Sequence, residues 1–183
     1  MTIFSRSSQS SKVEALNRAI DSDYESIYRH VRRLVIDHDD ARDIVQETYL
    51  KACSSIDSLK SPEAVKAWLF RIATNLALNA LKSGRTRSLV SEEHIPDVAE
   101  DAPAEPDPRL SFLDRAILQL TPAQRSIFDL RHFNEMSFKE IAGIVGGSPD
   151  TVRVVYHQAK EKMKRFLTAV ASSTAWHNRL FMI

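Results

Sequence analysis

Apolar residues recur at helical spacing along most of the chain. Ile27, Val31, Leu34 and Val35 fall at i, i+4, i+7 and i+8. The same spacing returns in four further segments, 41–52, 65–80, 110–120 and 152–166. A period near 3.6 residues is typical of amphipathic helices, and no segment shows a strand pattern. The sequence therefore predicts an all-α protein.

Glycine and cysteine are both scarce, and each scarcity excludes a class of protein. Only 4 of the 183 residues are glycine, which leaves little material for phosphate-cradling loops or for a β fold rich in tight turns. The single cysteine, Cys53, excludes an intrachain disulfide and a metal site built from several thiolates. We expect Cys53 to be a small buried apolar residue. No cofactor is expected.

The chain also lacks membrane and secretion signals. No apolar run reaches the roughly 18 residues that a membrane span needs. Residues 1–12 are rich in serine and lack the apolar core of a signal peptide. These features predict a cytoplasmic protein without membrane insertion.

An acidic, proline-containing stretch separates two helical blocks. Residues 88–108 contain seven acidic residues, four prolines and no lysine or arginine. Proline interrupts helices, and like charges extend a chain, so this stretch is predicted to be a linker. We therefore expect two small helical domains joined by this linker. The predicted division is a first domain at 12–87, the linker at 88–108, a second domain at 109–171 and a C-terminal extension at 172–183.

The second block contains clear helix boundaries. Residues 121–124 and 137–140 both have the pattern of a capping box. Gly146 can adopt a positive φ at a turn, and Ser148 followed by proline can begin the next helix. Two helices joined by such a turn predict a helix-turn-helix.

The second helix of this motif would present polar and basic side chains near its start. In helix-turn-helix proteins that half of the helix enters the major groove of DNA. The candidate DNA-contacting residues are Ser148, Thr151, Arg153, Val154, His157 and Lys160. The alternative is a helical hairpin that does not touch DNA.

The helix predicted at 65–80 and beyond has a second polar face. Arg71, Asn75, Asn79 and Lys82 fall at i, i+4, i+8 and i+11, and Arg85 extends the same basic edge. Asparagine can bond to base edges, and lysine and arginine can hold phosphates. Taken alone, however, this face could simply be solvated.

The helix predicted at 41–52 has an acidic face. Asp39 or Asp40 can cap its start. Its exposed residues would be Asp39, Asp43, Gln46 and Glu47. An acidic face cannot bind DNA, but it suits a basic protein surface. Here too, a merely solvated face is the alternative.

Four segments in order give a more specific indication than any one face. They read DIVQETYLKA at 43–52, AWLFRIATNLA at 67–77, LTPAQR at 120–125 and SFKEIA at 137–142. In this order the chain resembles the extracytoplasmic-function sigma factors, small two-domain subunits of bacterial RNA polymerase. The resemblance covers approximately residues 20–87 and 107–168.

The resemblance implies a role for each domain. Asp43, Gln46 and Glu47, together with Asp39, would bind the β′ clamp helices of the polymerase core. The loop at 57–67 and the Asn75 face would hold the melted minus-ten element. The implied minus-ten residues are Lys60, Arg71, Asn75, Asn79, Lys82 and Arg85. The second domain would read the minus-thirty-five element of promoter DNA and contact the β flap. An anti-sigma factor is a further implied partner.

Three positions depart from the family pattern. Thr74, Val155 and Gln158 stand where arginine is frequent in the family. We expect these changes to weaken DNA contacts and to alter the minus-thirty-five preference. The tail after Ala171 also extends past the usual end of the family.

Other functions stay open at this point. A sigma-like mimic could bind an anti-sigma factor and leave promoters alone, although it would not need the basic helix or the Asn75 face. A dimeric helix-turn-helix repressor would have no use for the acidic face or the linker. A hydrolase is disfavoured because no catalytic triad or metal-ligand spacing is present. The protein is therefore expected not to be an enzyme.

Overall fold

The computed structural model describes residues 3–84 and 112–180. Within these two ranges every regular element is a helix, which confirms the predicted all-α fold. The predicted linker at 88–108 and the candidate residue Arg85 lie outside the described residues.

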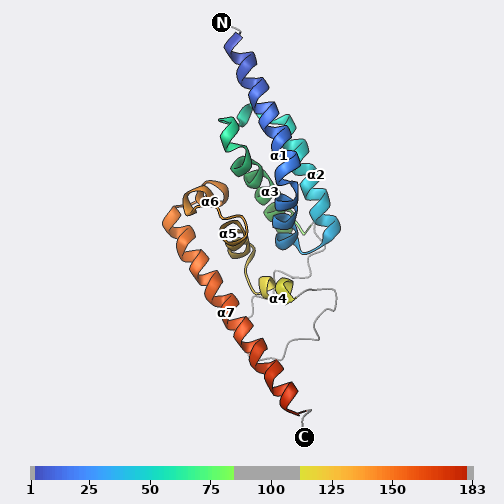
Figure 1. Ribbon diagram of the computed structural model, residues 1–183, viewed down its shortest axis with the longest axis vertical. Helices are drawn as coiled ribbons and strands as arrows, with labels where there is room; N and C mark the ends of the chain where they lie inside the picture. Colours follow the sequence, from blue (N-terminus) through green and yellow to red (C-terminus); the bar gives the residue numbers. More distant parts are fainter. Residues whose placement is uncertain (1–2, 85–111, 181–183) are drawn as a thin grey trace.

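The first part of the chain forms a bundle of three helices. These are α1 (Ile3–Val35), α2 (His38–Ser54) and α3 (Val65–Lys82), and each packs against the other two (Figure 1). Two short 3-10 helices, η1 (Ile56–Ser58) and η2 (Pro62–Ala64), fill the connection that the sequence predicted to be a loop. Ile27, Ile44 and Leu69 are among the side chains that form the core between the three helices.

The start of α2 differs from the prediction. Asp39 or Asp40 was expected to cap this helix, but the N-cap is Asp37, whose carboxylate accepts from the backbone N–H groups of both residues. Asp37 has the extended backbone that an N-cap requires, whereas Asp39 and Asp40 already lie in the first helical turn. There their negative charges interact favourably with the positive, N-terminal end of the helix dipole.

Residues 112–180 contain four helices. They are α4 (Phe112–Leu118), α5 (Pro122–His132), α6 (Phe138–Val145) and α7 (Pro149–Leu180). Both predicted capping boxes are present, one at Thr121 and Gln124 and the other at Ser137 and Glu140. Gly146 ends α6 with a φ of 85°, a conformation that glycine adopts without strain. The predicted helix-turn-helix is therefore confirmed in α6 and α7.

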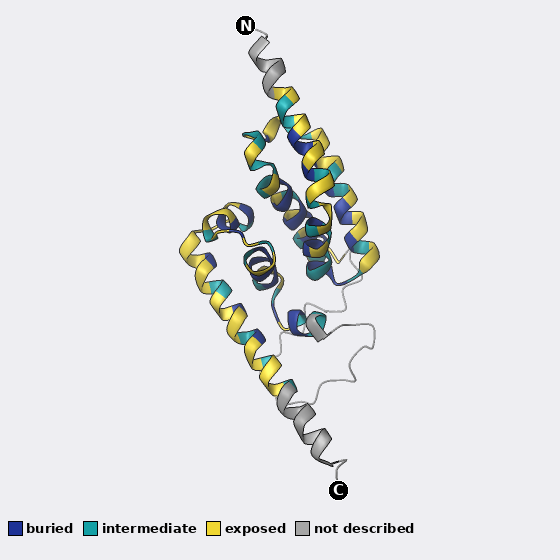
Figure 2. Cartoon of the chain, viewed as in Figure 1, coloured by how far each residue is buried: buried dark blue, intermediate teal, exposed yellow. Residues whose placement is uncertain are grey.

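The two parts pack against each other and share a core. Helix α5 packs against α1, and α6 packs against α3. One buried cluster includes Leu69 and Ala73 of α3, Leu130 of α5 and Ile141 of α6. In Figure 2 the buried residues lie on the sides of the helices that face one another, and the outer side of α7 is exposed.

Two residues at the edges of this core are unusual, one in its exposure to solvent and the other in its backbone conformation. Cys53 was expected to be buried, but it is exposed, because it lies on the outer face of α2. Ile36, just after α1, has a φ of 67°, which is rare for a β-branched residue. Its side chain is buried beside Ile117 and Phe128, so packing between the two parts holds it there.

Candidate functional site

The acidic face lies on the solvent side of α2. Asp39, Asp43 and Gln46 are exposed, and Glu47 is half-buried. Arg42 forms an ion pair of 3.7 Å with Asp39, and both side chains are largely exposed. The helix therefore presents carboxylates to solvent over about two turns, as the spacing predicted.

An apolar groove beside this face was missed by sequence reasoning. It is lined by Tyr24, Arg42, Val45, Gln46, Tyr49, Leu50 and Cys53. Leu50 is 64% exposed, and the rings of Tyr24 and Tyr49 stack with their centroids 6.1 Å apart. Burial, followed by the charge of Asp23, raises the pKa of Tyr49 to about 12. The groove combines residues from two different helices, α1 and α2. The one indication in the sequence was Leu50, an apolar residue on an otherwise polar face of the helix.

The polar face of α3 is also open to solvent. Arg71, Asn75, Asn79 and Lys82 are all exposed, and Lys60 is exposed in the connection before the helix. The opposite side of α3 is buried in the bundle. Four side chains that could bind nucleic acid therefore lie in one row along the helix.

Thr74 does not belong to this row. Its side chain is fully buried, and its hydroxyl lies 2.9 Å from Nε2 of His30. The expectation that threonine here replaces a DNA-contacting arginine was therefore wrong, because this position faces the core rather than solvent.

The start of α7 places all its candidate residues at the surface. Ser148, Thr151, Arg153, Val154, His157 and Lys160 are exposed, and Val154 is 56% exposed. The Ser148 hydroxyl accepts from the backbone N–H of Thr151 at 3.1 Å, so Ser148 also caps the helix. His157, Gln158, Lys162 and Arg165 line a shallow groove with Val154.

Arg153 is held by two neighbours. Its guanidinium lies 3.2 Å from the carboxylate of Asp150 and 5.4 Å from the ring centroid of Phe138 on α6. A half-exposed arginine in this position keeps donors free for a further partner.

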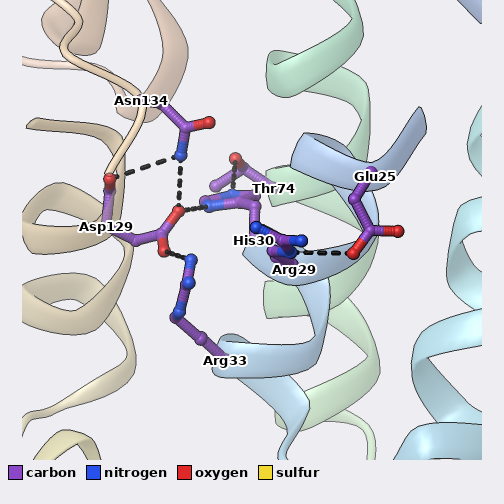
Figure 3. Close-up of polar contacts among 7 residues, drawn as sticks. All are labelled: Glu25, Arg29, His30, Arg33, Thr74, Asp129 and Asn134. Carbon is purple, nitrogen blue, oxygen red and sulfur yellow. Dashed lines mark hydrogen bonds and ion pairs between the residues drawn. The ribbon is translucent and has the colours of Figure 1, made fainter. Parts of the chain in front are cut away.

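A polar cluster is buried where the two parts of the chain meet. Asp129 of α5 accepts from Nδ1 of His30 and from Arg33 of α1, both at 2.6 Å, and from Asn134 at 2.9 Å (Figure 3). The side chains of His30 and Asp129 are 0% and 2% exposed. Because Nδ1 donates to the carboxylate, a neutral His30 ring accepts from Thr74 at Nε2. We call His30, Arg33, Thr74, Asp129 and Asn134 the Asp129 cluster.

The Asp129 carboxylate stays ionised in this cluster. Burial alone would raise its pKa, but His30 and Arg33 together hold the pKa below its ordinary value of 3.8. Arg33 also lies over the ring of Phe133, 3.9 Å from its centroid. The cluster was not predicted, because His30 and Asp129 are 99 residues apart.

Arg125 is a second buried link between the parts. Its guanidinium donates to the carbonyl of Leu34 at 2.6 Å and to that of Leu120 at 3.2 Å. Burial lowers its pKa to about 10, which still leaves the group charged at neutral pH. Arg125 therefore joins the end of α1 to the start of α5, close to the Asp129 cluster.

The described residues give no indication of a metal or membrane site. No three side chains of the metal-binding types gather in them. None of their helices is long and apolar enough to cross a membrane.

Two family models match the two helical parts. Residues 19–87 match the model for Sigma-70 region 2, and residues 113–163 match the model for Sigma-70 region 4. The first match covers the α2 and α3 faces, and the second covers the helix-turn-helix. The Asp129 cluster joins one matched region to the other.

Curated relatives and solved structures agree with these matches. The chain is 30% identical to the RNA polymerase sigma factor SigV of Bacillus subtilis, over 79% of this chain and 86% of that protein. It is also 30% identical to the ECF RNA polymerase sigma factor SigE of Mycolicibacterium smegmatis, over 81% of this chain and 60% of that protein. Among solved structures, the sigma factor RpoE of Bartonella quintana, in complex with the anti-sigma factor NepR, aligns with a TM-score of 0.63 at 22% identity. That alignment covers 83% of this chain and 96% of RpoE.

Proposed function

This chain belongs to the extracytoplasmic-function sigma factors, which direct bacterial RNA polymerase to promoters, and we propose how its exposed faces divide that work. The observation that carries the proposal is the exposure of all three candidate faces in a chain whose two regions are otherwise packed together. Domain boundaries at 87/88 and 108/109 are part of the proposal.

The acidic face and groove of α2 bind the core polymerase. Asp39, Asp43, Gln46 and Glu47 offer carboxylate and amide groups to a basic partner, here the β′ clamp helices. The neighbouring groove with exposed Leu50 supplies apolar area at the same place. A charged edge next to an apolar groove suits a helical partner.

The polar face of α3 holds the minus-ten element. Single-stranded bases need hydrogen-bonding groups, and their phosphates need cations. Asn75 and Asn79 supply the first, and Lys60, Arg71 and Lys82 supply the second, all from exposed positions. Arg85 is assigned to the same surface from the sequence alone.

The start of α7 reads the minus-thirty-five element in the major groove. Arg153 is the candidate base reader, because its guanidinium is half-exposed. Ser148, Thr151, Val154, His157 and Lys160 form the surrounding contact surface. The same region would contact the β flap of the polymerase.

Two further assignments complete the proposal. The protein acts in the cytoplasm, where the polymerase is, and it contributes binding rather than catalysis. An anti-sigma factor is its proposed regulator, as NepR is the partner of RpoE in the aligned complex. The support for this partner is the family membership.

In vitro transcription with core polymerase and a promoter library tests the function. The protein should select a single class of promoters, and transcription should depend on its addition. For the polymerase contact we expect Asp43→Lys to lose most retention of core enzyme in a pull-down, because like charges across an interface cost several kcal/mol. Glu47→Lys should do the same.

Glu14→Lys is the matched control, since Glu14 is an exposed acid on α1, away from the proposed surface. Equal retention of Asp43→Lys, Glu47→Lys and Glu14→Lys would contradict the assignment of α2.

A further inference from the structure

The packed arrangement brings the two proposed DNA-reading surfaces close together. Helix α6 packs against both α3 and α7. Packed helices lie about 8–10 Å apart, so the axes of α3 and α7 are separated by at most about 20 Å where both pack on α6. Arg153 of α7 lies over Phe138, which itself packs against the shared core.

Promoter geometry demands a much larger separation. By their numbering, the minus-ten and minus-thirty-five elements are about 25 base pairs apart, which is about 85 Å of B-form DNA at 3.4 Å per step. A chain that holds its two reading surfaces roughly 20 Å apart cannot engage both elements on such a duplex. The two regions must therefore separate before both elements are read.

Besides the shared apolar core, the polar contacts that resist this separation are concentrated around one carboxylate. Asp129 of region 4 is held by His30 and Arg33 of region 2, and Thr74 of region 2 supports the His30 ring. Nearby, Arg125 binds the carbonyl of Leu34, and Ile36 is held at a positive φ against region 4 residues. These residues come from both matched regions, and the contacts between the regions exist only while the regions are packed.

We propose that the Asp129 cluster is a latch that keeps the free sigma factor closed and must open before the protein reads a complete promoter. This proposal rests on the proposed assignment of the two reading surfaces. The buried carboxylate is satisfied only by groups from region 2, apart from Asn134 of its own region. Water can replace those partners when the regions separate.

Removal of the carboxylate should therefore favour the open form. Without Asp129, the closed form retains Arg33 and His30 at a buried site where neither has its carboxylate partner. In the open form both groups are hydrated, so the same substitution costs little there. The population consequently shifts towards separated regions, and each region keeps its own helices.

Distances between spin labels in the free protein test the latch. Cys53 is exposed on α2 and is the only cysteine of the chain, so it labels region 2. Ala123→Cys at the exposed start of α5 labels region 4. The protein with an intact latch should give one narrow distance distribution, and Asp129→Ala should shift most of the population to longer and broader distances. Glu161→Ala removes an exposed region 4 carboxylate and should leave the distances unchanged.

Arg33→Met provides a second route to the same result. It removes the charge from the region 2 side and keeps an apolar stem against Phe133. If Asp129→Ala does not fold, as judged by far-ultraviolet circular dichroism, Arg33→Met decides the outcome. An unchanged distance distribution in a folded variant of either kind, or a broad distribution already in the protein with an intact latch, would overturn the proposal.

A reversible cross-link tests whether opening is needed. Lys66 on α3 and Lys139 on α6 are exposed on two helices that pack against each other. In a Cys53→Ser background, Lys66→Cys and Lys139→Cys can therefore be joined by a bismaleimide with a reducible spacer. Joined protein should lose transcription from promoters that need both elements, and a reductant should restore it. Equal transcription before and after reduction would overturn the latch. Failure of the uncross-linked protein would instead count against the proposed function, while the distance measurement would still decide whether the latch exists.

Discussion

A guanidinium nitrogen of Arg125 donates a hydrogen bond of 2.6 Å to the carbonyl oxygen of Leu34, 91 residues earlier in the chain. Leu34 lies in the last turn of α1, where carbonyl groups lack partners within the helix. The positive charge of Arg125 also interacts favourably with the negative, C-terminal end of the helix dipole. One side chain of region 4 thus completes the end of a region 2 helix.

Replacement of Arg125 should destabilise the packed chain. Arg125→Ala leaves the carbonyls of Leu34 and Leu120 without this donor, and hydrogen bonds to a charged group contribute about 1.5–3 kcal/mol each. Relief of the buried charge offsets part of that loss, so we expect the free energy of unfolding to fall by about 3 kcal/mol. Urea denaturation measures the difference. Arg125→Lys, which can donate to one of the two carbonyls, should have a stability between those of wild type and Arg125→Ala. Equal stability of all three proteins would contradict this role of Arg125.

The Asp129 cluster should make stability depend on pH in a defined direction. The folded-state pKa of Asp129 lies below its ordinary value of 3.8. A carboxyl group with a lowered pKa stabilises the folded chain above its unfolded-state pKa, and that stability is lost as the pH falls through the lowered value. The contribution of Asp129 should therefore be complete at pH 7 and fade below about pH 4.

Asp129→Asn isolates this contribution. At pH 7 the variant should be less stable by about 3 kcal/mol, because a buried ion pair loses one partner. The difference from wild type should shrink when the same urea titrations are made at pH 3. A difference that is constant with pH would show that the Asp129 carboxylate is not ionised in the folded chain.

The sequence predicted the features that depend on near neighbours. Both capping boxes, the turn at Gly146 and the start of α7 at Pro149 follow from residues within four positions of one another, and the structure confirms them. The cap of α2 was misplaced by two or three residues, because Asp37, Asp39 and Asp40 are chemically equivalent in sequence. Only the backbone conformation distinguishes Asp37.

The features that depend on distant neighbours could not be read from the sequence. In the sequence, His30 is an ordinary polar residue of a helix. Its role becomes visible only in the fold, where Asp129 and Thr74 lie beside it. Thr74 was interpreted as a lost DNA contact because its inward direction depends on how α3 lies against α1. The groove beside Leu50 likewise needs Tyr24 from another helix.

Asn75 should be needed for promoter melting but not for polymerase binding. Asn75→Ala removes a hydrogen-bonding group from an exposed helix position, and alanine is the better helix former, so α3 should be preserved. We expect core binding to persist and permanganate reactivity of the minus-ten thymines to fall. Asn17→Ala, at an exposed position on α1, is the matched control. Equal reactivity with both variants would refute the role of Asn75.

Arg153 should determine sequence preference in the minus-thirty-five element. Asp150 and Phe138 hold its guanidinium at the start of α7, on a helix face opposite the buried Val152 and Ala159. From such a position arginine can bond to both acceptors of a guanine, which gives about 1–3 kcal/mol of discrimination. Val155 is half-buried and Gln158 carries no charge, so neither supplies a second cation to this part of the surface.

Selection from a library of minus-thirty-five sequences checks this role. With Arg153→Ala the preference should relax at one or two positions, by about tenfold to a hundredfold for a contact of that strength. Lys160 lies two turns further along α7 and is more suited to a phosphate. Lys160→Ala should therefore weaken the binding of all DNA sequences alike and reduce the salt dependence of binding. If Arg153→Ala also lowers affinity without any change in preference, Arg153 contacts only the phosphate backbone, and sequence is read elsewhere on α7.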